Sequence, residues 1–172
     1  QGRGFDVTIQ NITIQNTAKQ VSGYGGRCLQ TRGELGTLTL SGVTLTTDGS
    51  TYNSGTLQPL VIGGSQETAA NLIIENSIIT ADANAGKGYA VTAYNPVNMT
   101  LSGSTLRGQN DIYFSTPNNS EGADGSTVTI NESDLSAGGA ALFFQYASAS
   151  TYVKDVKVDV TASTLDAAQA VA

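Results

Sequence analysis

The acidic residues of this 172-residue chain are its first candidates for chemistry, because polysaccharide hydrolases work with paired carboxyl groups. Six acids lie on or next to short apolar runs: Glu75, Asp111, Glu132, Asp134, Asp155 and Asp159. Glu132 and Asp134 stand two residues apart and could point the same way, with Asp159 further along the chain. If the chain is an enzyme, we expect these three residues to be catalytic. The alternative, which the sequence favours, is solvated surface charge and no catalytic residue.

Four aromatic residues are the candidate ligand-binding side chains: Tyr94, Tyr113, Phe143 and Tyr146. If the neighbours of Tyr113 and Phe143 in the chain face a core, these two rings face outward, since side chains alternate along a strand. Exposed rings provide a platform for sugars or for partner proteins. The alternative is a stabilising ladder of stacked side chains, or a patch covered by residues 116–127.

Residues that bind metals or act as nucleophiles are scarce. The chain has no His and a single Cys, Cys28, so zinc sites and His-dependent triads are excluded and no internal disulfide forms. The loop 118–126 carries Glu121 and Asp124 and is the one candidate for a weak Ca²⁺ site, although acidic, glycine-containing loops are commonly turns. We expect no other metal and no cofactor.

A nine-residue phrase that recurs six times must position all these side chains. The starts of successive copies are 31, 34, 27, 29 and 30 residues apart. The copies are VTIQNITIQ (7–15), LTLSGVTLT (38–46), LIIENSIIT (72–80), MTLSGSTLR (99–107), VTINESDLS (128–136) and VDVTASTLD (158–166). Repeats at this spacing indicate a stacked solenoid.

The phrase itself predicts two strands joined by a tight corner. Its first, third and eighth positions are apolar in every copy, and its second is mostly polar, which is the alternation of a strand with one buried face. Four of the six residues at the fifth position are Asn or Gly, which tolerate left-handed backbone angles. Glu132 and Ala162 depart from that chemistry.

A further apolar run follows each copy and supplies a third strand per coil. These runs are residues 28–29, 60–62, 89–94, 112–114, 142–144 and 170–171. The connecting segments are rich in Gly, Ser, Asn and Asp and show no amphipathic helix, which argues against a βαβ fold. The sequence therefore predicts an all-β protein, a single-stranded parallel β-helix of about six coils and three parallel sheets. An antiparallel sandwich would explain the short strands but not the regular repeat.

Length and charge set limits on organisation and partners. We expect one β-helix domain over residues 1–172, either as a segment of a longer solenoid or as a subunit that stacks end to end, because neither end shows a cap. The chain has 8 basic and 14 acidic residues, a net charge of −6. Nucleic acid is an unsuitable partner, since phosphate binding needs clustered Lys and Arg. No apolar run is long enough to insert into a membrane.

Phrases such as MTLSGSTLRG and STVTINESDLSAGGAALFF resemble the right-handed parallel β-helix of pectate-lyase-like proteins. Their texture is most similar to passenger domains of bacterial autotransporters and related surface adhesins. The resemblance implies right-handed coils and a bacterial protein that is secreted or held at the cell surface. Some members of that superfamily cleave acidic polysaccharides, whereas many others adhere, form stalks or self-associate.

Three functions follow as hypotheses. The preferred one is an adhesin or structural stalk that makes non-catalytic contacts with a glycan or with a protein of a host or neighbouring cell. The second is a polysaccharide lyase or hydrolase. The third is a fibre subunit that associates end to end.

Overall fold

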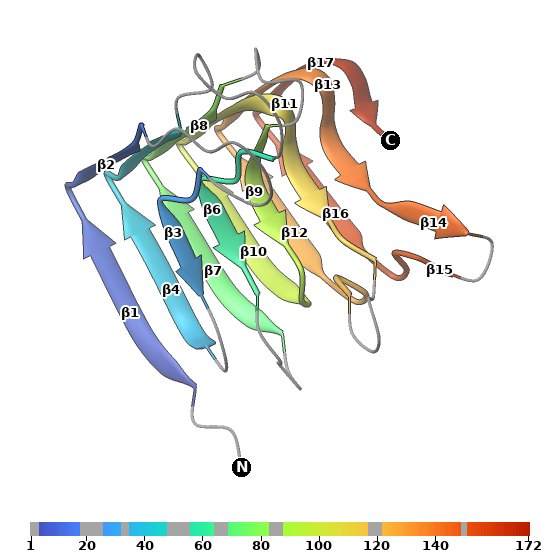
Figure 1. The fold of residues 1–172 in the computed structure, drawn as a ribbon, viewed down its shortest axis with the longest axis horizontal. Helices are drawn as coiled ribbons and strands as arrows, with labels where there is room; N and C mark the ends of the chain where they lie inside the picture. Colours follow the sequence, from blue (N-terminus) through green and yellow to red (C-terminus); the bar gives the residue numbers. More distant parts are fainter. Residues whose placement is uncertain are drawn as a thin grey trace.

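The computed structural model describes residues 4–17, 26–31, 35–47, 56–63, 69–82, 88–116, 122–148 and 151–172. Strands are the regular structure of this described part, and all but two of them run parallel to their neighbours in a solenoid (Figure 1). The prediction of an all-β parallel solenoid is thus confirmed.

The first strands of the six phrases form one six-stranded parallel sheet. Its members in spatial order are β1 (Phe5–Gln10), β4 (Leu35–Ser41), β7 (Ala70–Glu75), β10 (Val97–Ser102), β12 (Thr127–Asn131) and β16 (Lys157–Thr161). The register pairs equivalent positions of successive copies, so that Leu40 lies opposite Ile74 and Ile74 opposite Leu101. The repeat of the sequence is therefore the repeat of the coils.

The second and third strands of each coil belong to one larger parallel sheet. The second strands are β2 (Thr13–Asn16), β5 (Thr44–Thr47) and β8 (Ile78–Ala81), and the third strands are β3 (Leu29–Thr31), β6 (Leu60–Ile62) and β9 (Tyr89–Ala93). In the later coils both are merged into β11 (Thr105–Phe114), β13 (Asp134–Phe144) and β17 (Thr164–Val171).

Two large sheets therefore replace the three that were predicted. The reason lies at a register shift between Gly108 and Asn110, where β11 passes the second corner without losing its strand pairing. Before the shift β11 pairs with β8, and after it β11 pairs with β9.

The interior is a narrow apolar column. The predicted inward positions of the central coils are buried, and the four-coil row Leu60, Val91, Ile112 and Leu142 extends the column along the third strands. Burying one Leu or Ile side chain contributes about 1.5–3 kcal/mol. About four turns have this closed interior, fewer than the six coils predicted, because the interior residues of the first and last coils stay partly exposed.

The first corner of every coil has the left-handed backbone that the sequence predicts. The φ angles are 53° at Asn11, 63° at Gly42, 48° at Asn76, 54° at Gly103, 48° at Glu132 and 49° at Ala162. Glu132 and Ala162 keep the conformation without the favourable residue type. Stacking on the neighbouring coils explains this, since the amide of Glu132 donates to the carbonyl of Thr161 on the next coil.

A column of serines beside this corner links the coils. The backbone amides of Val43, Ser77, Ser104 and Ser133 each donate to the serine Oγ one coil further on, at 3.0–3.2 Å. The acceptors are Ser77, Ser104, Ser133 and Ser163. Each of these hydroxyls also donates to the carbonyl two residues before it, at 2.7–2.8 Å. Amides that would otherwise be buried without a partner are thereby satisfied.

Candidate functional site

The three candidate catalytic carboxylates lie on two neighbouring coils. Glu132 is exposed at the corner, and Asp134 is half-buried at the first residue of β13. Asp159 is exposed on β16 and pairs with Thr129, three residues before Glu132 on the neighbouring strand. The catalytic role of these three carboxylates stays a prediction.

Tyr113 and Phe143 are stacked on neighbouring coils, as the sequence predicts. They pair in register, and their ring centroids lie 5.6 Å apart at an interplanar angle of 12°. Tyr89 stacks on the other face of Tyr113 at 4.4 Å and 4°. Tyr113 is 8% exposed, however, so the expectation of an exposed ring is wrong for this residue. This row is the stabilising ladder that we had set out as the alternative.

Tyr94 is half-buried and belongs to a hydrogen-bonded network. Its hydroxyl accepts a hydrogen bond of 2.8 Å from Nε2 of Gln58, which also donates to Oγ1 of Thr92 at 3.1 Å. Oε1 of Gln58 accepts from the guanidinium of Arg27 at 3.3 Å. Gln58 has no exposed surface, so this network orders the outside of the third strands rather than offering a free ring.

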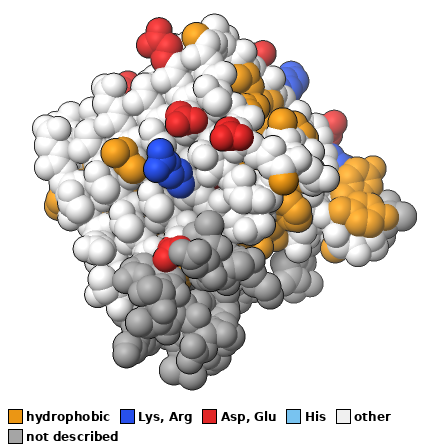
Figure 2. Space-filling view, turned by 90° about the horizontal axis from the view of Figure 1, so that it is seen from above, with side chains coloured by type: hydrophobic (Ala, Val, Ile, Leu, Met, Phe, Trp, Pro, Cys, Tyr) orange, Lys and Arg blue, Asp and Glu red, His pale blue; other side chains and the backbone are white. Residues whose placement is uncertain are grey.

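Tyr146 is the predicted ligand-binding residue that is freely accessible, with 67% of its surface exposed. It begins β14 (Tyr146–Ser148), which pairs antiparallel with β15 (Thr151–Tyr152). The two strands project from the solenoid beyond the end of β13 (Figure 1), and Figure 2 shows a hydrophobic group on the same projection.

The ring of Tyr146 has a partner in Tyr152, which is 40% exposed. Their centroids are 6.3 Å apart with an interplanar angle of 29°, and Nζ of Lys154 lies 5.0 Å from the centroid of Tyr152. This trio, Tyr146, Tyr152 and Lys154, is called the hairpin platform below. It combines apolar faces with a cation and hydroxyl groups, the usual composition of a recognition surface.

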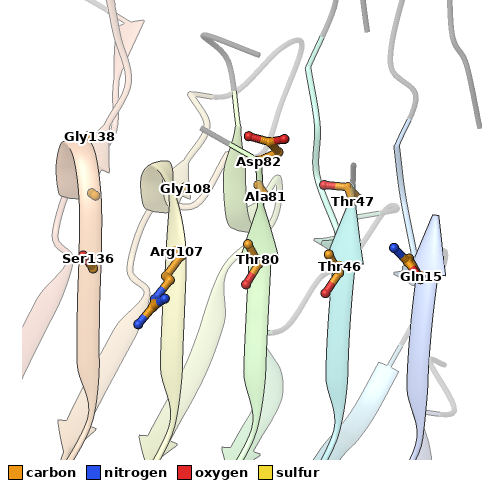
Figure 3. A pocket seen from close by; sticks show the side chains of 11 residues that line it. Gln15, Thr46, Thr47, Thr80, Ala81, Asp82, Arg107, Gly108, Ser136 and Gly138 are labelled. Atoms are coloured by element: carbon orange, nitrogen blue, oxygen red, sulfur yellow. The ribbon is translucent and has the colours of Figure 1, made fainter. Parts of the chain in front are cut away.

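A groove of about 570 Å³ crosses the outside of the second strands (Figure 3). Its wall consists of residues at the same position of successive repeats, each paired in register with the equivalent residue of the next coil. The members are Gln15, Thr46, Thr80, Arg107 and Ser136. Figure 2 views the molecule from this side, where most of the described surface carries no charge.

The floor of this groove is formed by small residues one or two positions further along the strands, including Ala81, Gly108, Ala137 and Gly138. Thr47 lies in the same row as Ala81 and is 1% exposed, and its Oγ1 has no hydrogen-bond partner among the residues that the structure describes. In Figure 3 the hydroxyl of Thr47 points along the row toward the next strand. An unsatisfied buried hydroxyl is unusual in a folded protein.

Asp111 is a buried carboxyl group on β11, four residues beyond Arg107 of the groove wall. The register places it between Ala90 of β9 and Ala141 of β13, and it has no exposed surface. Within the described part of the chain neither carboxylate oxygen makes a hydrogen bond of normal geometry, although the nearby Gly108 amide and Arg107 both favour the ionised form. Burial outweighs both and, with the repulsion of Asp134, raises the pKa of Asp111 to about 8.

The Ca²⁺ candidate is described in part. Oδ1 of Asp124 accepts a hydrogen bond of 2.8 Å from the amide of Lys154, whereas Glu121 lies outside the described residues. Within the described ranges, His, Cys, Asp and Glu side chains form no group of three that could hold a metal ion. The weak Ca²⁺ site stays a prediction.

Sequence reasoning missed the groove, Tyr152 and the burial of Asp111. The groove wall is the ninth position of the repeat, which is polar in all six copies, so a reading of that column could have found it. Asp111 directly precedes the apolar run Ile112 to Phe114, and an acid at the edge of such a run is a signal of a buried carboxyl group. Tyr152 carries no comparable signal.

No protein-family model, curated protein or solved structure matches this chain. The fold assignment therefore rests on the structure itself, and the likeness to pectate-lyase-like and autotransporter β-helices stays a prediction. The part of the chain that the structure describes has no helix long and apolar enough to cross a membrane.

Proposed function

We propose that this protein is a non-catalytic adhesive module of a secreted or surface-attached bacterial protein, and that it contacts a glycan through the hairpin platform. The observation that carries the proposal is the stacked, exposed pair Tyr146 and Tyr152 with Lys154 beside it. Rings of this kind give a large contact area for a small loss of conformational freedom.

The position of the platform also supports this proposal. A rigid parallel solenoid carries the two rings on strands that stand away from the stack of coils (Figure 1). Sites on a rigid scaffold lose little entropy on binding, so a small contact can be selective. A protein surface is the second type of partner that such a platform suits.

Retention on a glycan array tests this function. We expect Tyr146→Ala and Tyr152→Ala each to weaken retention of the bound glycan at least tenfold. Ile78→Ala is the matched control, because Ile78 is also an exposed apolar residue, 48% exposed, but lies on β8. Equal retention by all four proteins would refute a role of the platform. Release of shortened glycan chains would replace adhesion with the enzymatic hypothesis.

End-to-end association is a second candidate, favoured by apolar side chains at both ends of the stack. On the first coil Phe5 is 57% and Ile12 46% exposed, and on the last coil Val160 is 43% and Val171 59% exposed. A second copy stacked on these coils would bury them and continue the parallel sheets. Sedimentation at rising concentration should then show growing oligomers that Val160→Glu abolishes, whereas a constant monomer mass would refute this candidate.

A further inference from the structure

The groove on the second strands is a second surface that neither the predicted site residues nor the hairpin platform includes. We propose that it binds an uncharged linear glycan that lies along the axis of the solenoid. This site is made of different residues from the platform, so the proposal stands or falls independently of the proposed function.

The length and direction of the groove suit an extended polymer. Its wall contains one residue from each of five successive coils, from Gln15 to Ser136. With about 4.8 Å between neighbouring strands, the four steps span roughly 19 Å. The polar groups are thus presented at regular intervals along a straight line, as the hydroxyls of a linear glycan are.

The chemistry of the lining favours a guest rich in hydroxyl groups. Thr46, Thr80 and Ser136 each offer a hydroxyl that can donate and accept, and Gln15 adds an amide. The small floor residues leave room for a chain to approach the sheet.

The balance of charge distinguishes a neutral glycan from an acidic one. Arg107 and Asp82, one cation and one anion, are the charged side chains among the described lining residues. The whole chain has a net charge of −6, which repels a polyanion at long range. A single guanidinium, that of Arg107, suits hydrogen bonds to sugar hydroxyls rather than neutralisation of repeated acidic groups.

An extended peptide fits less well. β5, β8 and β11 are each paired on both sides, so the groove offers no strand edge to which a peptide backbone could add. Among the described lining residues the apolar members are alanines, which offer no deep pocket for peptide side chains.

The test uses nuclear magnetic resonance titration of the whole chain with three probes. These are a neutral β-1,4-linked glucose hexasaccharide, a galacturonic acid hexasaccharide and an uncharged polar hexapeptide. The variants are Thr80→Val, which removes a hydroxyl at constant shape, and Arg107→Gln. Thr129→Val is the matched control, because Thr129 is an exposed strand threonine on β12, in the other large sheet.

We expect the neutral hexasaccharide to shift the amide signals of Thr46, Thr80 and Ser136. We expect Thr80→Val and Arg107→Gln each to weaken its binding at least fivefold. The control Thr129→Val should bind it as tightly as the wild type does. Binding of the acidic glycan or of the peptide alone would overturn the proposal. So would the absence of shifts at these three amides. Shifts that vanish only in Tyr146→Ala would place the glycan on the platform and would also overturn it.

Discussion

Replacing Asp111 with Asn should remove a pH dependence of stability that this one carboxyl group creates. Asp111 has no exposed surface, and its oxygens have no hydrogen-bond partner in the described structure. Its burial raises its pKa from 3.8 to about 8. The unfolded chain ionises this group near pH 4, whereas the folded chain keeps it protonated up to about pH 8.

The sign of the effect follows from proton binding. Between these two pKa values the folded state holds one proton that the unfolded state has released, so the free energy of unfolding falls as the pH rises. The slope is about 1.4 kcal/mol per pH unit. Over the whole interval the loss would reach about 6 kcal/mol, and between pH 5 and 7.5 it is about 3 kcal/mol. Below pH 4 the group is protonated in both states and has no effect.

Urea unfolding, followed by far-ultraviolet circular dichroism at several pH values, measures this difference. Comparing Asp111→Asn with the wild type cancels the other carboxyl groups, which titrate in both proteins. The variant should gain about 3 kcal/mol of stability over the wild type between pH 5 and 7.5. Asp159→Asn is the control, since Asp159 is exposed, and its curve should run parallel to that of the wild type. If the curve of Asp111→Asn is parallel too, Asp111 is not a buried protonated acid.

Three further changes test how the coils are held together. Ser104→Ala removes the acceptor of a buried amide and should lower the free energy of unfolding by about 1–3 kcal/mol in a urea titration. Ser163→Ala, in the more accessible last coil, should have a smaller effect in the same titration. Equal effects would contradict the role of the serine column. Glu132→Asn should stabilise the fold by about 1 kcal/mol, because Asn tolerates the left-handed backbone of that corner. The control Glu132→Gln should leave the melting temperature unchanged. A loss of stability in Glu132→Asn would show that the Glu side chain itself is needed. Leu101→Ala should lower the free energy of unfolding by about 2–5 kcal/mol, because Leu101 is fully buried. Val160→Ala should lower it much less, because Val160 is 43% exposed. Similar losses of melting temperature would mean that the last coil is as closed as the centre.

The sequence by itself determined the solenoid, because the information lies in local periods that each coil repeats. Apolar residues at the first, third and eighth positions define the buried face whichever coil they belong to. Asn11 and Gly42 indicate the left-handed corner by residue type alone, and φ at both is positive. The stacking of Tyr113 on Phe143 also follows, because both occupy the same position of successive coils.

Other features depend on contacts between coils that no local period encodes. The second and third sheets merge because β11 keeps its pairing across Gly108, which depends on the strands on either side. The number of closed turns depends on whether a coil has neighbours on both faces. The sequence pattern of the sixth copy resembles that of the fourth, yet Val160 is exposed and Leu101 is buried.

The candidate sites show the same division. The polar residues at the ninth position of the repeat can be seen in the sequence. They border a groove only because the small residues Ala81, Gly108 and Ala137 lie side by side in the folded stack. Outward-facing positions such as Tyr113 and Asp111 were expected to be solvated, and only the tertiary structure buries them. Alternation along a strand specifies which face a side chain is on, whereas its exposure is decided by what packs on that face.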